Sequence, residues 1–223
     1  MPPTLSSTPT DAFVQPGVLP PHTPGGTFFQ TEPFSMLSLF AAALLAASSQ
    51  AAPTSLPSPE RRQELLFEAA RLGRTDIIGP LIKLGADVNA HDKRDFTPLI
   101  LAAYAGQMET AEALIAAGAD ACKPDANQGN TAQMGVAFKG EDAIAARLLK
   151  AGCDINARNK AGQTALMMAA LFNRSNQIEM LLAAGADPAI ADASGRTAAS
   201  IAQAQGNEAV ADRLGNLLAK STR

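Results

Sequence analysis

Residues 85–90 read Gly85-Ala86-Asp87-Val88-Asn89-Ala90, and the start of this stretch returns three times along the chain. It returns as Gly-Ala-Asp at 118–120, as Gly-Cys-Asp at 152–154 and as Gly-Ala-Asp at 185–187. The glycines are therefore separated by 33, 34 and 33 residues. A constant period of this length is typical of repeat proteins, in which each unit stacks only on its neighbours. We therefore expect an elongated stack rather than one central core.

A second motif runs in phase with the first and predicts where a helix begins in each unit. Threonine precedes an apolar stretch at Thr97, Thr131, Thr164 and Thr197. A threonine side chain accepts a backbone N–H as an N-cap, and proline suits the first helical position that follows. The expected ends of these helices, at residues that tolerate a positive φ, are Gly106, Gly140, Asn173 and Gly206. Apolar residues at helical spacing follow each end, so each unit is predicted to be a helix-turn-helix pair.

These motifs resemble the ankyrin repeat, with its Thr-Pro-Leu opening and its Gly-Ala-Asp-Val-Asn ending, from about Glu60 to Arg223. The resemblance implies an all-α repeat solenoid, an ankyrin stack whose units are joined by β-hairpin fingers. We predict a repeat domain at 59–223 with five units, which are 60–92, 93–125, 126–159, 160–192 and 193–223. The histidine of the motif is replaced by Ile100, Met134, Met167 and Ser200. Packing must therefore replace the hydrogen bonds that this histidine makes.

The chain before the repeats divides into three predicted parts. Residues 1–35 are rich in proline, serine, threonine and glycine and contain no Lys or Arg, so we predict a disordered tail. Residues 36–51 are predicted to be a signal peptide, because the apolar segment 34–47 is shorter than the roughly 20 residues that span a bilayer. Residues 52–58 are a linker. Translation from Met36 would leave the tail unmade, and a membrane anchor at 34–47 is the alternative to export.

A narrower resemblance concerns the middle of the chain. Residues 97–104, 134–141, 161–164 and 169–172 look like those of small bacterial ankyrin proteins that are exported to the periplasm. Some members of that group are linked with catalase and with protection against peroxide. The resemblance implies a periplasmic or secreted location and a role in oxidative stress. It implies no catalytic residue.

Composition excludes several functions. A formal net charge of −3 does not favour binding to nucleic acid. The two histidines, His22 and His91, and the two cysteines lack the spacing of metal ligands. We find no catalytic serine, histidine and aspartate set and no glycine loop that would hold phosphate. The sequence therefore predicts no catalytic, cofactor or metal site, and no enzyme.

The cysteines leave two possibilities. Export would permit a disulfide between Cys122 and Cys153. However, equivalent positions in stacked units lie about 10 Å apart, whereas a disulfide needs Cα atoms within about 7 Å. Cys122 is also offset by three residues, since it aligns with Asn156. We therefore expect two small, buried, unbonded residues, with the disulfide as the alternative.

The predicted function is binding of another protein by a monomeric chain. Ankyrin stacks bind partners through the finger tips and the exposed edge of the first helix. Aromatic and arginine side chains dominate interface energies, and basic finger tips would steer an acidic partner surface. The predicted partner-binding residues are Lys93, Arg94, Phe96, Tyr104, Phe138, Lys139, Arg158, Lys160, Leu171, Phe172 and Arg196. Inward packing of Phe138 and Phe172 is the competing interpretation.

Two other functions remain open at this stage. The chain could be an inhibitor or immunity-type protein that caps the active site of an enzyme, which would use the same surface. It could also be a subunit of an envelope enzyme. Loss of an enzyme's activity on binding would indicate the first, and intrinsic turnover that is lost on one substitution would indicate the second.

Overall fold

The computed structural model describes residues 56–221, so the predictions for the tail at 1–35, the signal peptide at 36–51 and most of the linker lie outside it. Within the described residues the chain forms helices and no strand. The helices are α1 (Pro59–Leu72), α2 (Thr75–Lys83), α3 (Pro98–Tyr104), α4 (Met108–Ala116), α5 (Ala132–Lys139), α6 (Asp142–Leu149), α7 (Ala165–Leu171), α8 (Ser175–Ala183), α9 (Ala198–Ala204) and α10 (Glu208–Ser221). The predicted all-α repeat solenoid is confirmed.

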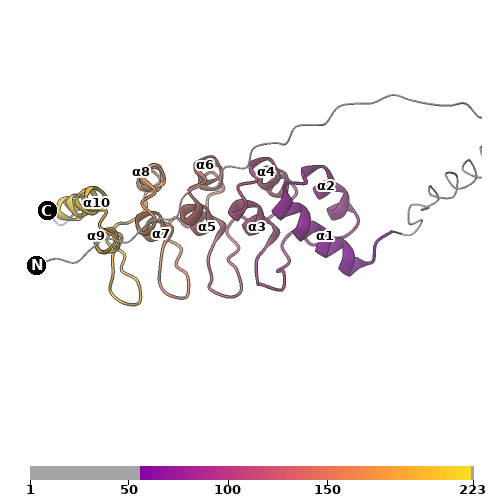
Figure 1. Cartoon of the computed structure of the whole chain (residues 1–223), viewed down its shortest axis with the longest axis horizontal. Helices are drawn as coiled ribbons and strands as arrows, with labels where there is room; N and C mark the ends of the chain where they lie inside the picture. The colour runs from indigo at the N-terminus through magenta and orange to yellow at the C-terminus, as the bar shows by residue number, and fades with distance from the viewer. Residues whose placement is uncertain (1–55, 222–223) are drawn as a thin grey trace, which may run out of the picture. The chain divides into compact units, whose positions relative to one another are not determined.

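The helices form two parallel rows (Figure 1). Helices α3, α5, α7 and α9 form one row, which we call the inner row. Each of these helices contacts the next one in the row, and α1 contacts α3. Helices α4, α6, α8 and α10 form the other row, which we call the outer row. Four loops project beyond the inner row (Figure 1). We call these loops the first to fourth fingers, which are residues 84–97, 117–131, 150–164 and 184–197. Because contacts run between neighbours, stability is distributed along the stack.

Threonine caps fix the start of each inner helix, as the sequence predicts. The hydroxyl of Thr97 accepts the N–H of Ile100 at 3.2 Å, and the hydroxyl of Thr164 accepts the N–H of Met167 at 3.3 Å. Thr131 caps α5 in the same way. At α9 the cap is a reciprocal pair, since Ser200 also accepts the N–H of Thr197.

Two turns use a residue other than glycine at positive φ. Asp95 adopts φ 69° and Asn173 adopts φ 53°. Aspartate and asparagine tolerate this region better than other side chains do. The predicted positive φ at Asn173 is confirmed.

Three of the four side chains that replace the motif histidine are packed in the core, whereas Ser200 is exposed and accepts the N–H of Thr197. Ile100, Met134 and Met167 are each 2% exposed or less. No hydrogen bond could replace the missing imidazole at these apolar side chains. Burial therefore takes its place, as the sequence indicates.

The fingers differ from the β-hairpins that we expected. Among the described residues the only β-type pairing is a bridge between Ala191 and Thr197. Backbone hydrogen bonds join each finger to the next. The N–H of Ala126 donates to Asp95 O at 3.1 Å, that of Lys160 to Gln128 O at 2.9 Å, and that of Ala193 to Ala161 O at 2.9 Å. Each finger is also closed at its own tip by a backbone hydrogen bond, such as that from the N–H of Asp192 to Arg196 O at 2.9 Å. The fingers are therefore closed turns without regular strands, and they stabilise one another at their tips.

The expectation of two unbonded, buried cysteines is wrong. Cys122 and Cys153 form a disulfide, with their Cα atoms 5.3 Å apart. Cys122 lies in the second finger and is exposed, and Cys153 lies in the third finger. The separation of about 10 Å applies to equivalent positions in neighbouring units, and Cys122 and Cys153 are not equivalent. The two cysteines are 31 residues apart, three short of the 34-residue step between these units, and this offset brings the base of one finger against the next.

The other finger junctions show why this offset brings side chains together. Asn89 is the first-finger equivalent of Cys122, and its Oδ1 accepts the N–H of Asp120 at 2.8 Å. Asn156 likewise accepts the N–H of Asp187 at 2.9 Å. Both pairs have the same separation of 31 residues as the disulfide. The disulfide therefore occupies the place of a side-chain hydrogen bond between successive fingers.

Candidate protein-binding surface

Four aromatic side chains form a continuous row along the inner face of the stack. Phe96 begins the row before α3, and Tyr104 and Phe138 lie near the ends of α3 and α5. Phe172 caps α7. The ring centroids are separated by 6.0 Å, 5.9 Å and 4.6 Å in that order. The structure therefore brings these four predicted residues together.

Phe138 is the most exposed member of the row. It is 40% exposed, and its edge-to-face contact with Phe172 leaves part of its ring in contact with solvent. A groove of about 170 Å³ runs beside these two rings, and Leu171 and Met168 line it as well. Two amide side chains, Asn130 and Gln163, line the same groove. An apolar groove with a few amides at its edge is suited to a side chain and backbone of another protein.

Tyr104 is held in place by a close backbone approach. Gly135 lies on the next inner helix, and a Cβ there would come within 2.8 Å of Cε2 of Tyr104. Glycine at this helical position therefore gives the ring its room. Burial raises the pKa of Tyr104, and the charge of Asp125 adds to the rise. The phenol is therefore neutral at physiological pH and can donate a hydrogen bond.

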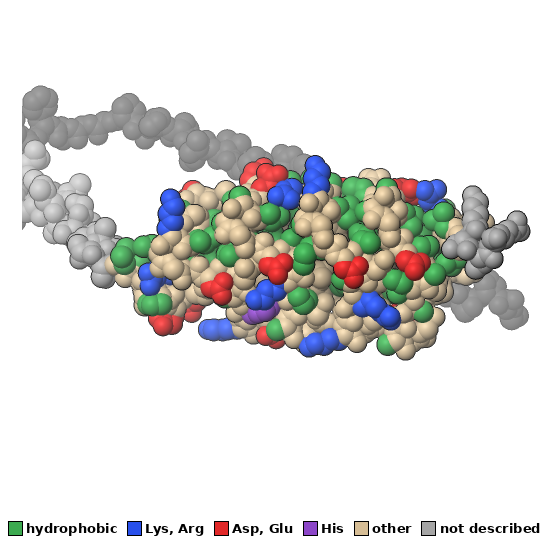
Figure 2. All heavy atoms as spheres, turned by 180° about the vertical axis from the view of Figure 1, so that it is seen from behind, with side chains coloured by type: hydrophobic (Ala, Val, Ile, Leu, Met, Phe, Trp, Pro, Cys, Tyr) green, Lys and Arg blue, Asp and Glu red, His purple; other side chains and the backbone are tan. Residues whose placement is uncertain are grey.

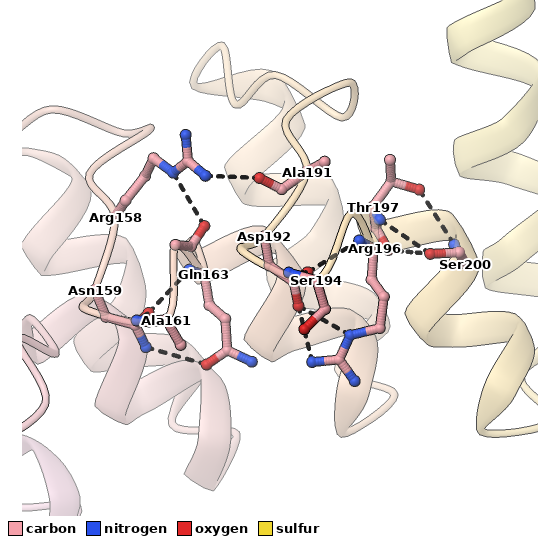
Figure 3. Close-up of polar contacts among 11 residues, drawn as sticks. Arg158, Asn159, Ala161, Gln163, Ala191, Asp192, Ser194, Arg196, Thr197 and Ser200 are labelled. Atoms are coloured by element: carbon pink, nitrogen blue, oxygen red, sulfur yellow. Dashed lines mark hydrogen bonds and ion pairs between the residues drawn. The ribbon is translucent and has the colours of Figure 1, made fainter.

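Three of the predicted basic residues are engaged within the fingers. Arg158 donates from Nη2 to Ala191 O of the next finger at 2.7 Å, and from Nε to Gly162 O (Figure 3). Lys160 donates from Nζ to Ala126 O of the preceding finger at 2.8 Å. Arg196 is bound to Asp192 in its own finger. These side chains stabilise the finger array, so their availability to a partner is reduced.

The remaining basic residues differ in their surroundings. Arg94 lies over the ring of Phe96, and its Cζ is 5.4 Å from the ring centroid. Its Nε is 3.7 Å from Oδ2 of Asp92. Lys93 and Lys139 are exposed, and neither makes an ion pair with another described residue. Lys139 directly follows Phe138. A positive charge therefore flanks the exposed ring at this point of the row.

The sequence interpretation missed two further contacts between fingers. Lys123 donates from Nζ to Asn89 O at 2.8 Å, and His91 Nε2 lies 3.2 Å from Pro124 O. Both pairs are 33 or 34 residues apart. This separation matches the repeat period, but period alone does not tell which finger side chains reach their neighbour. The finger side chains are therefore structural to a greater degree than residue type indicates.

A buried acid organises the fourth finger (Figure 3). Asp192 is 6% exposed and accepts the N–H groups of Ser194 and Arg196. The bond from the Arg196 N–H is the main cause that lowers the pKa of Asp192 below its ordinary value of 3.8, and burial opposes it. Asn159 has the same role in the third finger, where its Oδ1 accepts two N–H groups.

We expect Asp192→Asn to lower stability near neutral pH and to have no effect in strong acid. The pKa of Asp192 is lower in the folded than in the unfolded protein, so its charge stabilises the fold above 3.8 and this contribution is lost as the pH falls through the folded value. Asparagine keeps the accepting oxygen, as Asn159 shows, but not the charge. Urea unfolding at about pH 7 and about pH 2 measures the difference. An equal difference between the two proteins at both pH values would contradict this assignment.

Charges of both signs are mixed on the face drawn in Figure 2. Acidic side chains recur along it with basic ones between them, among hydrophobic side chains (Figure 2). In the described part of the chain no group of three or more His, Cys, Asp and Glu residues is placed to hold a metal ion. Nor does any described helix have the length and apolar character needed to cross a bilayer.

The comparisons with known proteins agree with this geometry. A family profile described as "Ankyrin repeats (3 copies)" matches residues 42–125, 66–159 and 134–220. These matches cover more than half of the chain, and the chain belongs to the ankyrin-repeat family. Ankyrin-repeat proteins are in general non-catalytic modules that bind other proteins. The narrower likeness to exported, catalase-linked proteins is not shown by these matches.

Three curated relatives illustrate how widely this module occurs. The chain is 34% identical over 132 residues to the ankyrin repeat and KH domain-containing protein mask-1 of Caenorhabditis elegans, covering 59% of this chain and 5% of that one. It is 34% identical over 131 residues to a putative ankyrin repeat-containing protein of Treponema pallidum, covering 59% and 44%. It is 52% identical over 46 residues to the mitochondrial disaggregase of Bos taurus, covering 21% and 7%. The match thus spans less than half of each relative.

Proposed function

We propose that this chain is an exported, non-catalytic module that captures another protein on the aromatic row formed by Phe96, Tyr104, Phe138 and Phe172. The observation that carries the proposal is the part-exposed Phe138 ring beside an apolar groove of about 170 Å³. A partner would insert an apolar side chain into this groove. Exposed Lys139 next to the ring favours an acidic residue beside that side chain.

Export is supported by two observations. Disulfides persist in oxidising compartments outside the cytosol, and the Cys122–Cys153 bond is exposed at Cys122. The apolar stretch at 34–47 has the length of the core of a signal peptide. We therefore propose a periplasmic or secreted location. N-terminal sequencing of the mature protein from its native source tests it, and a mature chain that still contains residues 34–47 would contradict cleavage.

Phe138→Ala is expected to abolish capture of the partner and to leave the helical fold unchanged. The ring is part-exposed, so its loss removes contact area from the groove with little loss of core packing. The measurement is affinity capture from the native envelope fraction by the wild-type and variant chains, followed by quantitative mass spectrometry. Circular dichroism of both proteins establishes that the fold is retained.

Leu56→Ala is the matched control, because Leu56 is a 70% exposed apolar side chain at the start of the described residues and does not line the groove. We expect this variant to retain the proteins that the wild type captures. If Phe138→Ala captures the same proteins in the same amounts as Leu56→Ala, the aromatic row is not the binding surface.

A role in defence against peroxide rests on the family resemblance alone. The same capture experiment addresses it, because it identifies the partner without presupposing its activity. Recovery of a peroxide-decomposing enzyme with the wild type, and its loss with Phe138→Ala, would support the role. Recovery only of proteins unrelated to peroxide would count against it.

A further inference from the structure

A second cleft lies at the bases of the second and third fingers, apart from the aromatic row. Its volume is about 360 Å³, within the range of clefts that bind small molecules. Leu148 and Leu149 at the end of α6, Met134 of α5 and Ile155 supply apolar walls. The Cys122–Cys153 disulfide forms part of the boundary. This covalent link between the fingers limits how far the cleft can open or collapse.

The repeat pattern is broken at a residue that lines this cleft. Leu99 and Leu166 occupy one repeat position in the second and fourth units, and each is 1% exposed. The third unit has Gln133 at this position, 34 residues after the first leucine and 33 before the second. A leucine at 133 would extend the apolar core as it does in both neighbours. Glutamine instead places a polar amide at the cleft.

A second departure from the pattern also lies at this cleft. The residue after the Gly-Ala-Asp motif is Val88 in the first finger and Ile155 in the third, but Ala121 in the second. Ala121 lines the cleft. Loss of the branched side chain leaves the space that valine fills elsewhere. Two departures from the repeat, and the disulfide, therefore meet at one place.

The amide of Gln133 has no hydrogen-bond partner. Both Nε2 and Oε1 are buried, and neither bonds to any other residue in 56–221. A buried amide that lacks partners destabilises a folded protein, because its groups have lost their bonds to water. The terminal torsion of glutamine is broad, so the amide can rotate about it at low cost and align its donor and acceptor with a ligand. A ligand with a complementary donor and acceptor would satisfy both atoms.

The charge around the cleft restricts the ligand further. Asp154 is the one charged side chain among the described residues that line it, and no basic residue does. An anionic ligand would therefore be repelled. We propose that this cleft is a binding site for a small, neutral, mostly apolar molecule that carries one carboxamide or lactam group. None of the four aromatic residues of the protein-binding surface lines this cleft, although Met134 lines both the cleft and the groove beside Phe138. The proposal does not rest on the proposed protein-binding function.

Benzamide and toluene are a suitable pair of probes, since they share an aromatic ring and differ in the carboxamide. Titration of each into the purified full chain with its disulfide intact is followed by ligand-observed NMR. We expect benzamide to bind with a Kd on the order of 1 mM and toluene at least about tenfold more weakly. A shift of the Gln133 side-chain amide resonance should accompany benzamide binding.

Three variants locate the effect. Gln133→Leu restores the residue of the neighbouring units and should weaken benzamide binding at least about tenfold. Ala121→Val keeps the amide and fills the cleft, and should weaken both probes. Gln203→Leu, an exposed position on α9 outside the cleft, should bind as the wild type does. Circular dichroism of each variant confirms that it is folded.

Several results would overturn the proposal. They are the absence of saturable benzamide binding to the wild type, toluene binding as tight as that of benzamide, and undiminished benzamide binding to Gln133→Leu. Undiminished binding to Ala121→Val would place the probe outside this cleft and would also overturn it.

Discussion

Reduction of the Cys122–Cys153 disulfide is expected to lower the free energy of unfolding by about 3–4 kcal/mol, because the bond closes a loop across 31 residues and so restricts the unfolded chain. Cys122 is exposed, so a dithiol reductant can reach the bond in the folded protein. The measurement is urea unfolding with and without dithiothreitol, followed by circular dichroism. Unchanged midpoints, with reduction verified by thiol labelling, would contradict the expected contribution.

Two double variants separate the covalent link from the junction it replaces. Cys122→Ser with Cys153→Ser should lose the same stability as reduction and should no longer respond to dithiothreitol. Cys122→Asn with Cys153→Ala introduces the asparagine and alanine found at the first junction, where Asn89 bonds to the backbone on both sides of Ala119. We expect this variant to be more stable than the serine variant by about 1 kcal/mol. Equal stability would indicate that the second junction cannot form the asparagine bonds.

Leu114→Ala is expected to lower the free energy of unfolding by about 2–5 kcal/mol. Leu114 lies on α4 and is 0% exposed. Its helix has only nine residues, so it is marginal in isolation and depends on contacts with α3 and with its neighbours in the outer row. Truncation leaves a cavity that this Ala-rich surrounding cannot fill, because alanine side chains have no rotamers with which to adjust.

Leu72→Ala is the control for this change. Leu72 is the last residue of α1 and is 62% exposed, so the same substitution there should change stability by less than about 0.5 kcal/mol. Urea unfolding of both variants measures the difference. A loss at Leu114 no greater than that at Leu72 would show that the units do not depend on the shared core.

The sequence was sufficient for features set by local chemistry. The threonine caps depend on a side chain and an N–H three residues away, so Thr97 and Thr164 could be assigned without knowledge of the fold. The positive φ at Asp95 follows from its turn in the same way. The row of Tyr104 and Phe138 was predictable because repeats place equivalent residues in line.

The features that the sequence did not yield depend on how one unit meets the next. Residue type predicts Arg158 and Lys160 as partner contacts, but it does not reveal that both side chains donate hydrogen bonds to neighbouring fingers. The departure at Gln133 is visible once the units are aligned, but that it borders a cleft is not. A local sequence pattern does not predict these contacts, because they form between residues from different repeats.

The repeat period by itself determined the helix pairs, their caps and the stacked fold, since each results from interactions within one unit or between identical positions of successive units. Tertiary structure alone decided that Cys122 meets Cys153 and that the cleft beside them opens. The physical reason is that each finger contacts the next one at an offset. This offset places residues 31 apart in the sequence in contact, although they do not share a repeat position.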